Sequence, residues 1–146
     1  MAVIGPLILI AANADRPSLR TIDRSPTAAR EVVQRYYAAL DRGDFRAAWL
    51  AWDRGGAASG KTLAAFTHGF AGTARTRVIA GTPTDGEGAA GSVFVTVPVR
   101  VEAVLKNGHR QRFAGSYVLR RVNDVPGATR AQLAWHLASA SLRPVR

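Results

Sequence analysis

The chain has 146 residues, of which 47% are hydrophobic, so it is long enough for one folded domain and too apolar to be disordered. It contains no cysteine, which excludes disulfides and thiolate metal sites, and its three histidines are too far apart for a common metal motif. The net charge of +10 comes mainly from scattered arginines without an aromatic stripe between them, so we do not expect nucleic-acid binding.

The first residues are typical of a secretory signal. Residues 3–12 are almost entirely apolar, and a small-x-small sequence suited to signal peptidase follows at residues 12–14. The run is too short to cross a bilayer. We interpret residues 1–14 as a signal peptide without a basic start, which predicts a periplasmic or secreted mature chain with no transmembrane segment; the alternative is a buried N-terminal strand. Residues 15–25 are interpreted as a linker to a single domain over residues 26–146.

Three helices are expected at the start of this domain. Ser25 and Pro26 are typical of an N-cap followed by proline at the first helical position, and apolar residues recur at helical spacing as far as Leu40, before Gly43. Asp44 is expected to cap a second helix. A third, shorter helix is expected over about residues 62–70.

The rest of the chain alternates as strands do. A strand is expected over residues 75–80, and a last one over about residues 132–142. Between them, two long β-rich runs flank Asn107-Gly108, a strong signal for a two-residue type I′ hairpin over residues 91–122. In that register Val101 pairs with Ala114, and Val97 pairs with Val118.

Helices followed by strands without alternation predict an α+β domain, in which three N-terminal helices cover one face of an antiparallel sheet of about four strands. In the expected register, apolar side chains fall on both faces of the hairpin. We therefore expect the second face to be buried in a homodimer through the sheet. Pro98 is expected to mark an edge position or a bulge.

Two glycine-rich segments match nucleotide-binding patterns but lack the context that such sites need. Residues 55–62 match the Walker A pattern letter for letter, but they follow an amphipathic helix and not a buried strand. Residues 86–91 match the dinucleotide fingerprint, but they lead into a strand. We interpret both segments as loops and expect no cofactor.

Three segments together resemble the nuclear transport factor 2-like superfamily, which includes ketosteroid isomerases and polyketide cyclases. They are residues 36–49 (YYAALDRGDFRAAW), 113–119 (FAGSYVL) and 135–139 (WHLAS). The resemblance covers about residues 28–142. It implies a cystatin-like cone whose curved sheet and helices enclose a pocket, and commonly a dimer through the sheet. It implies no particular reaction.

The candidates for a pocket lining are aromatic residues with polar tips, one phenylalanine and one arginine: Tyr37, Trp52, Phe66, Arg100, Tyr117 and Trp135. We expect the pocket to bind a small apolar or anionic molecule, or a protein partner, without catalysis. Electrostatic binding to an anionic polymer or lipid is a further possibility, and its affinity would fall with salt.

The alternative is an enzyme of the isomerase, cyclase or hydratase type. Isomerases of the resembled family place a carboxylate base and a phenol donor around an apolar cavity. Here Asp53 or His68 would be the base and Tyr37 the donor. The long strands carry a single carboxylate, Glu102 near the hairpin tip, so the second acidic group of an isomerase has no counterpart. A half-buried histidine is more often structural than catalytic.

Overall fold

The computed structural model describes residues 21–86, 88 and 91–146. The strands form one antiparallel sheet in the order β1-β3-β4-β5, and β2 pairs with β3 beyond the end of β1. The expected signal peptide and most of the linker lie outside the described residues. The elements are α1 (Pro26–Asp41), α2 (Phe45–Leu50), the 3-10 helix η1 (Ala57–Ser59), α3 (Leu63–Gly69), β1 (Thr73–Ala80), β2 (Thr84–Asp85), β3 (Ser92–Leu105), β4 (Arg110–Val122), α4 (Arg130–Leu133) and β5 (His136–Pro144).

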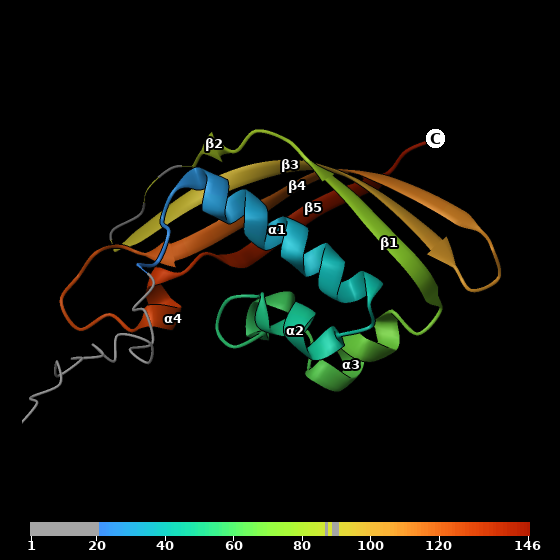
Figure 1. Cartoon of the computed structure of the whole chain (residues 1–146), viewed down its shortest axis with the longest axis horizontal. Helices are drawn as coiled ribbons and strands as arrows, with labels where there is room; N and C mark the ends of the chain where they lie inside the picture. The colour runs from blue at the N-terminus through green and yellow to red at the C-terminus, as the bar shows by residue number, and fades with distance from the viewer. Residues whose placement is uncertain (1–20, 87, 89–90) are drawn as a thin grey trace, which may run out of the picture.

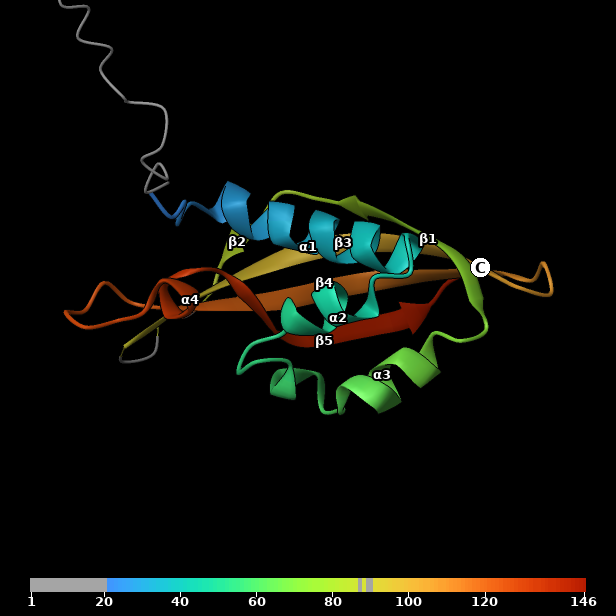
Figure 2. The same cartoon turned by 60° about the horizontal axis from the view of Figure 1, so that its bottom comes forward.

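The first three helices pack on one face of the sheet (Figures 1 and 2). Helix α1 runs along β1 and β3, while α2 packs against α1 and α3. This arrangement confirms the expected α+β, cystatin-like cone with three N-terminal helices on a twisted antiparallel sheet. The four long strands were expected from the sequence, and the two-residue β2 was not.

The helix ends follow from their capping residues. The Ser25 side chain accepts a hydrogen bond from the Ala28 N–H, and Pro26 begins α1. After the C-cap residue of α1, Gly43 adopts a left-handed φ of 77°, which ends the helix. The Asp44 side chain then accepts from the Ala47 N–H and begins α2. These expected boundaries are confirmed.

The last strand begins later than the sequence indicated. Thr129 and Gln132 form a capping box, in which each side chain bonds the other residue's backbone N–H. This box stabilises the short helix α4 over residues 130–133. The expected strand over residues 132–142 therefore starts at His136 and extends to Pro144.

The expected turn at the tip of the long hairpin is wrong. The Gly108 N–H donates to the Leu105 carbonyl, and the Leu105 N–H donates to the His109 carbonyl, so the loop has three residues, 106–108. A type I′ turn would require Asn107 to be left-handed as well. In the described chain Arg54 is the one non-glycine residue with positive φ, and at the tip only Gly108 has it. The turn is therefore type I followed by a glycine bulge.

The three-residue loop moves the pairing of β3 and β4 by one residue. Val101 pairs with Phe113, and Val97 pairs with Tyr117. A shift of one residue exchanges the faces of a strand. The valines of β3 and the large apolar residues of β4 consequently share the face under the helices, where the buried residues are Val95, Val97, Val99, Val101, Tyr117 and Leu119.

The opposite face, here called the open face, carries mostly polar side chains, among them the exposed Arg100, Glu102 and Arg112. No helix of the described chain covers it (Figure 2). The expected division of apolar residues between the two faces does not occur. The sequence-based reason for expecting a homodimer therefore no longer holds, and the homodimer stays a prediction.

Pro98 is not a bulge. It pairs with Ser116 within an unbroken register between β3 and β4. On its other side the pairing of β3 with β1 has already ended at Val99, which pairs with Ala80. The pairing of β3 with β2 begins only at Thr96, which pairs with Thr84. Proline lacks a backbone donor, and it occupies a gap between two short neighbours of β3.

Candidate functional site

A pocket of about 320 Å³, here called the inner pocket, lies between the helices and the sheet. Its walls come from α1, the end of α3 and four strands. Most of its lining is apolar or aromatic, which suits a small organic ligand. The lining residues are Tyr36, Tyr37, Leu40, Gly69, Phe70, Thr73, Thr76, Val101, Ala103, Gln111, Phe113, Tyr117 and Leu142.

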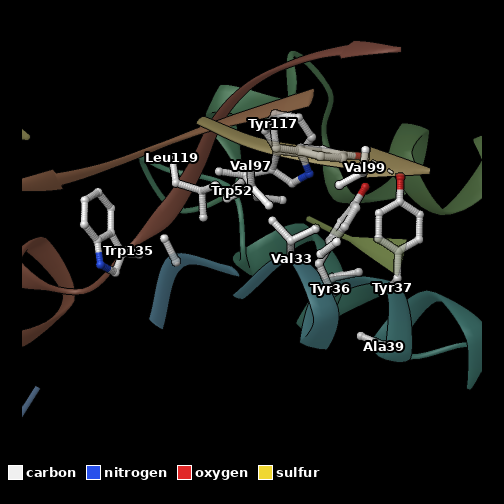
Figure 3. Close-up of a cluster of buried hydrophobic side chains, with 14 of the residues drawn as sticks. Val33, Tyr36, Tyr37, Ala39, Trp52, Val97, Val99, Tyr117, Leu119 and Trp135 are labelled. Carbon is white, nitrogen blue, oxygen red and sulfur yellow. Dashed lines mark hydrogen bonds between the residues drawn. The ribbon is translucent and has the colours of Figure 1, made fainter. Parts of the chain in front are cut away.

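Three tyrosines form the inner wall of this pocket. Tyr36 and Tyr37 extend from α1 towards the sheet, where Tyr117 projects from β4 (Figure 3). The Tyr37 and Tyr117 hydroxyls are 2.6 Å apart and share a hydrogen bond. The Tyr36 ring meets both neighbours edge-on, with centroid distances of 5.1 Å to Tyr37 and 6.0 Å to Tyr117.

Burial keeps these phenols protonated. It raises the pKa of Tyr37 far above its ordinary value, against a smaller opposing effect of the hydrogen bond from Tyr117. Burial also raises the pKa of Tyr117, and the neighbouring Tyr37 adds to that rise. The pKa of Tyr36 rises for the same main reason. The three side chains are therefore neutral hydrogen-bond donors and not bases at physiological pH.

The Tyr37–Tyr117 pair has one hydroxyl proton more than its mutual bond uses. Each phenol carries one donor hydrogen, and one of the two hydrogens lies in the shared bond. Neither oxygen has another hydrogen-bond partner in the described chain. One O–H is thus left to donate to an acceptor in the pocket.

The remaining polar groups of the pocket are few and uncharged. The Thr76 hydroxyl donates to the Tyr37 carbonyl oxygen, and Gln111 is half-buried on β4. Within the described residues, the lining contains no carboxylate, imidazole or cationic side chain. The pocket can therefore bind a neutral acceptor, but it supplies no base for proton abstraction.

Trp52 and Phe66 support the tyrosines from behind. Trp52 meets Tyr36 and Tyr117 edge-on at 6.1 and 6.2 Å, and Phe66 lies between Tyr36 and Phe70. The Trp52 Nε1 is buried without a hydrogen-bond partner in the described residues. Both side chains belong to the core and neither lines the inner pocket.

Trp135 lies at the opposite end of the core from Tyr37 (Figure 3). Its Nε1 donates to the Ser25 carbonyl at 3.0 Å, and the Arg121 guanidinium lies over the ring at 5.3 Å. The residue joins the start of α1 to the start of β5. Trp135 stabilises the fold and does not line the inner pocket.

Asp53 and His68, the two expected bases, do not line the inner pocket. Asp53 Oδ2 accepts from Arg120 Nη1 at 3.0 Å, and the Asp53 backbone pairs with β5 through Leu137. His68 is exposed on α3. The structure therefore brings neither residue together with Tyr37.

Arg100, which was expected to line the pocket, lies on the open face. The sequence did not indicate three residues that do line the inner pocket, namely Tyr36, Phe70 and Gln111. The correct hairpin register would have predicted Gln111 as a lining residue, because Gln111 pairs with the buried Ala103. Helical spacing alone does not place Tyr36 and Tyr37 on one wall.

The Walker-like segment is a loop that folds on itself. The Trp49 Nε1 donates to the Lys61 carbonyl, and a Cβ on Gly56 would collide with the Trp49 ring. Gly56 also has a left-handed φ of 97°. The loop follows helix α2, as the sequence indicated. The other glycine-rich segment joins β2 to β3, and its residues 87, 89 and 90 lie outside the described chain.

The fold and its cavity define an α+β domain with an internal, phenol-lined pocket. No protein-family model matches the chain, and no curated protein matches it. Among solved structures, it is similar to Aln2 from a Streptomyces species, with 15% sequence identity, coverage of 85% of this chain and 94% of that chain, and a TM-score of 0.49.

In the part of the chain described, no helix is long and apolar enough to span a membrane, and no three acidic or histidine side chains group as a metal site.

Proposed function

We propose that this chain binds a small, mainly apolar molecule in the inner pocket and holds it through one neutral hydrogen-bond acceptor, without catalysis. The observation that carries the proposal is the Tyr37–Tyr117 pair, which has one O–H more than its mutual bond uses and lines an otherwise apolar cavity. A buried donor gains most from a ligand that pairs with it. A ketone, ester or ether oxygen on an apolar body satisfies this requirement.

The ligand of this pocket is neutral. No lysine, arginine or histidine lines the inner pocket within the described residues. A carboxylate placed there would lose its hydration without gaining a counter-charge. The size of the ligand is set by the volume of the inner pocket, about 320 Å³, which suits a bicyclic molecule.

The enzyme alternative keeps Tyr37 as its donor but lacks a base. Asp53 is bound to Arg120, and His68 is exposed on α3. An isomerase, cyclase or hydratase needs a proton acceptor within hydrogen-bond reach of the substrate. The absence of such a group from the described lining favours binding over catalysis.

We also propose membership of the nuclear transport factor 2-like superfamily and export from the cytoplasm. The first rests on three helices followed by a twisted antiparallel sheet that they cover on one face. The second rests on the apolar residues 3–12 and the small-x-small sequence after them. Mass spectrometry of exported protein would show cleavage after Ala14; intact protein retained in the cytoplasm would contradict export.

The binding proposal is tested with prodan, a neutral naphthalene ketone whose fluorescence reports polarity and hydrogen bonding. Wild-type protein should bind it, and Tyr37→Phe/Tyr117→Phe should bind roughly fivefold more weakly, which is about 1 kcal/mol for one lost hydrogen bond. Each single variant keeps one phenol and should bind almost as well as wild type. Equal binding by wild type and the double variant would refute the proposed role of the pair.

A further inference from the structure

A second hollow lies on the open face, on the other side of the sheet from the inner pocket. It has a volume of about 530 Å³ and is lined by five arginines and one glutamate around apolar side chains. We call it the basic hollow. It is bordered by Arg77, Ile79, Arg100, Val101, Glu102, Arg112, Phe113, Ala114, Arg143, Val145 and Arg146. Val101 and Phe113 also line the inner pocket and are paired with each other, so their side chains lie on the face under the helices.

The register of the sheet builds this hollow in two rows. Arg100, Ala114 and Arg143 are directly paired across β3, β4 and β5. The two arginines are two strand spacings apart, about 10 Å between Cα atoms. Ala114 lies between the two arginines and has a short side chain. The longer side chains of Arg100 and Arg143 therefore flank a depression with an apolar bottom.

The second row supplies one internal ion pair. Glu102 is paired with Arg77 on β1 and with Arg112 on β4, and its carboxylate lies 3.8 Å from Arg112 Nε. In contrast, the side chains of Arg77, Arg100 and Arg143 form no ion pair or hydrogen bond within the described chain. These three arginines leave an uncompensated positive charge around the hollow.

We propose that the basic hollow binds a small organic dianion with a flat apolar body, and that Arg100 and Arg143 bind its two acidic groups. Guanidinium groups match carboxylate and phosphate oxygens through paired N–H donors and stack on flat rings. Ala114 and the exposed Ile79 contact the apolar body. This site is independent of the inner pocket, whose ligand is neutral.

Two other occupants fit the hollow less well. A second copy of this chain packed face to face would oppose arginine with arginine, which is unfavourable without a bridging anion. A polynucleotide is favoured by an extended basic stripe, whereas this site is one hollow with an apolar floor and a glutamate inside it.

The test uses naphthalene-2,6-dicarboxylate, a rigid aromatic dianion, in a calorimetric titration at low salt. Arg100→Gln and Arg143→Gln should each weaken binding roughly fivefold or more, and the double variant should weaken it further. The control, Arg35→Gln/Arg46→Gln, removes two charges from the exposed surface of α1 and α2 and should bind as wild type does. The uncharged naphthalene-2,6-dimethanol should not bind in the hollow. Circular dichroism confirms that each variant is folded.

Several outcomes would overturn the proposal. They are no binding of the dicarboxylate by wild type, an equal loss in both double variants, and tighter binding of a single-stranded oligonucleotide than of the dicarboxylate. A dimer that dissociates when Arg100 and Arg143 are replaced would assign the face to a second copy instead. Tyr37→Phe/Tyr117→Phe should leave dicarboxylate binding unchanged, so failure here and failure of the inner-pocket proposal are separate results.

Discussion

At the scale of single residues, the Tyr37–Tyr117 hydrogen bond couples α1 to β4 inside the core. Replacing either tyrosine by phenylalanine leaves the other hydroxyl buried without its partner and should lower the free energy of unfolding by about 1–2 kcal/mol. The double variant leaves no such group, so it should lose less than the sum of the single losses. Urea unfolding of the four proteins gives this coupling. Strictly additive losses would show that the two hydroxyls do not interact.

Asp53 provides a test of the enzyme alternative. Asp53→Asn should leave prodan binding unchanged, because the carboxylate does not line the inner pocket. It should lower the free energy of unfolding by about 1 kcal/mol, since the partner Arg120 is two-thirds buried and loses its counter-charge. A variant that folds normally but loses prodan binding would place Asp53 at the site after all.

Gly115 allows β4 and β5 to approach closely. A Cβ at this position would collide with the Ser141 carbonyl oxygen on β5. Gly115→Ala should therefore lower the free energy of unfolding by about 2–3 kcal/mol, measured in urea. Gly72→Ala is the matched control, because a Cβ there meets nothing within 4 Å. Similar stability of the two variants would contradict the close approach.

At the scale of elements, Asp41 fastens the end of α1 to β1. Its carboxylate accepts from Arg75 Nε at 3.0 Å and from the Thr76 N–H at 2.9 Å. The Arg75 side chain, and then the Thr76 N–H, hold the pKa of Asp41 below its ordinary value of 3.8. These bonds also offset an unfavourable negative charge at a helix C-terminus.

A lowered pKa means that the ionised Asp41 stabilises the fold above pH 3.8, and that this contribution disappears as the pH falls through the lower, folded-state pKa. Asp41→Asn should cost about 1 kcal/mol at pH 7. The difference from wild type should shrink below pH 3.8. Asp85→Asn, which removes a carboxylate without a partner in the described chain, should show neither effect. A difference that is the same at pH 7 and pH 2.5 would contradict the account.

Helix ends were predictable and strand pairing was not, and the reason is physical. Caps such as Ser25 and Asp44 act on backbone groups three residues away, so a local pattern defines them. The hairpin register depends on the number of loop residues, and Asn107-Gly108 fits both a two-residue turn and a three-residue turn with a bulge. The sequence does not distinguish these two, yet the choice decides which face each side chain occupies.

At the scale of the whole molecule, that register separates two environments. The neutral aromatic pocket lies under the helices, and the basic hollow lies on the open face. Tyr37 and Tyr117 were both selected from the sequence as lining residues, but their contact joins positions 80 residues apart and could not be predicted from spacing. Arg100 was also selected, and the sheet pairing places it with Arg143 on the opposite side.

The most direct measurement is the infrared carbonyl stretch of prodan labelled with ¹³C at its ketone and bound to the protein. A hydrogen bond from a phenol lowers that frequency. We expect a lowered frequency in wild type, and a higher frequency, typical of an apolar solvent, in Tyr37→Phe/Tyr117→Phe. The same frequency in both proteins would show that the tyrosine pair does not donate to the ligand, and would contradict the proposed function of the inner pocket.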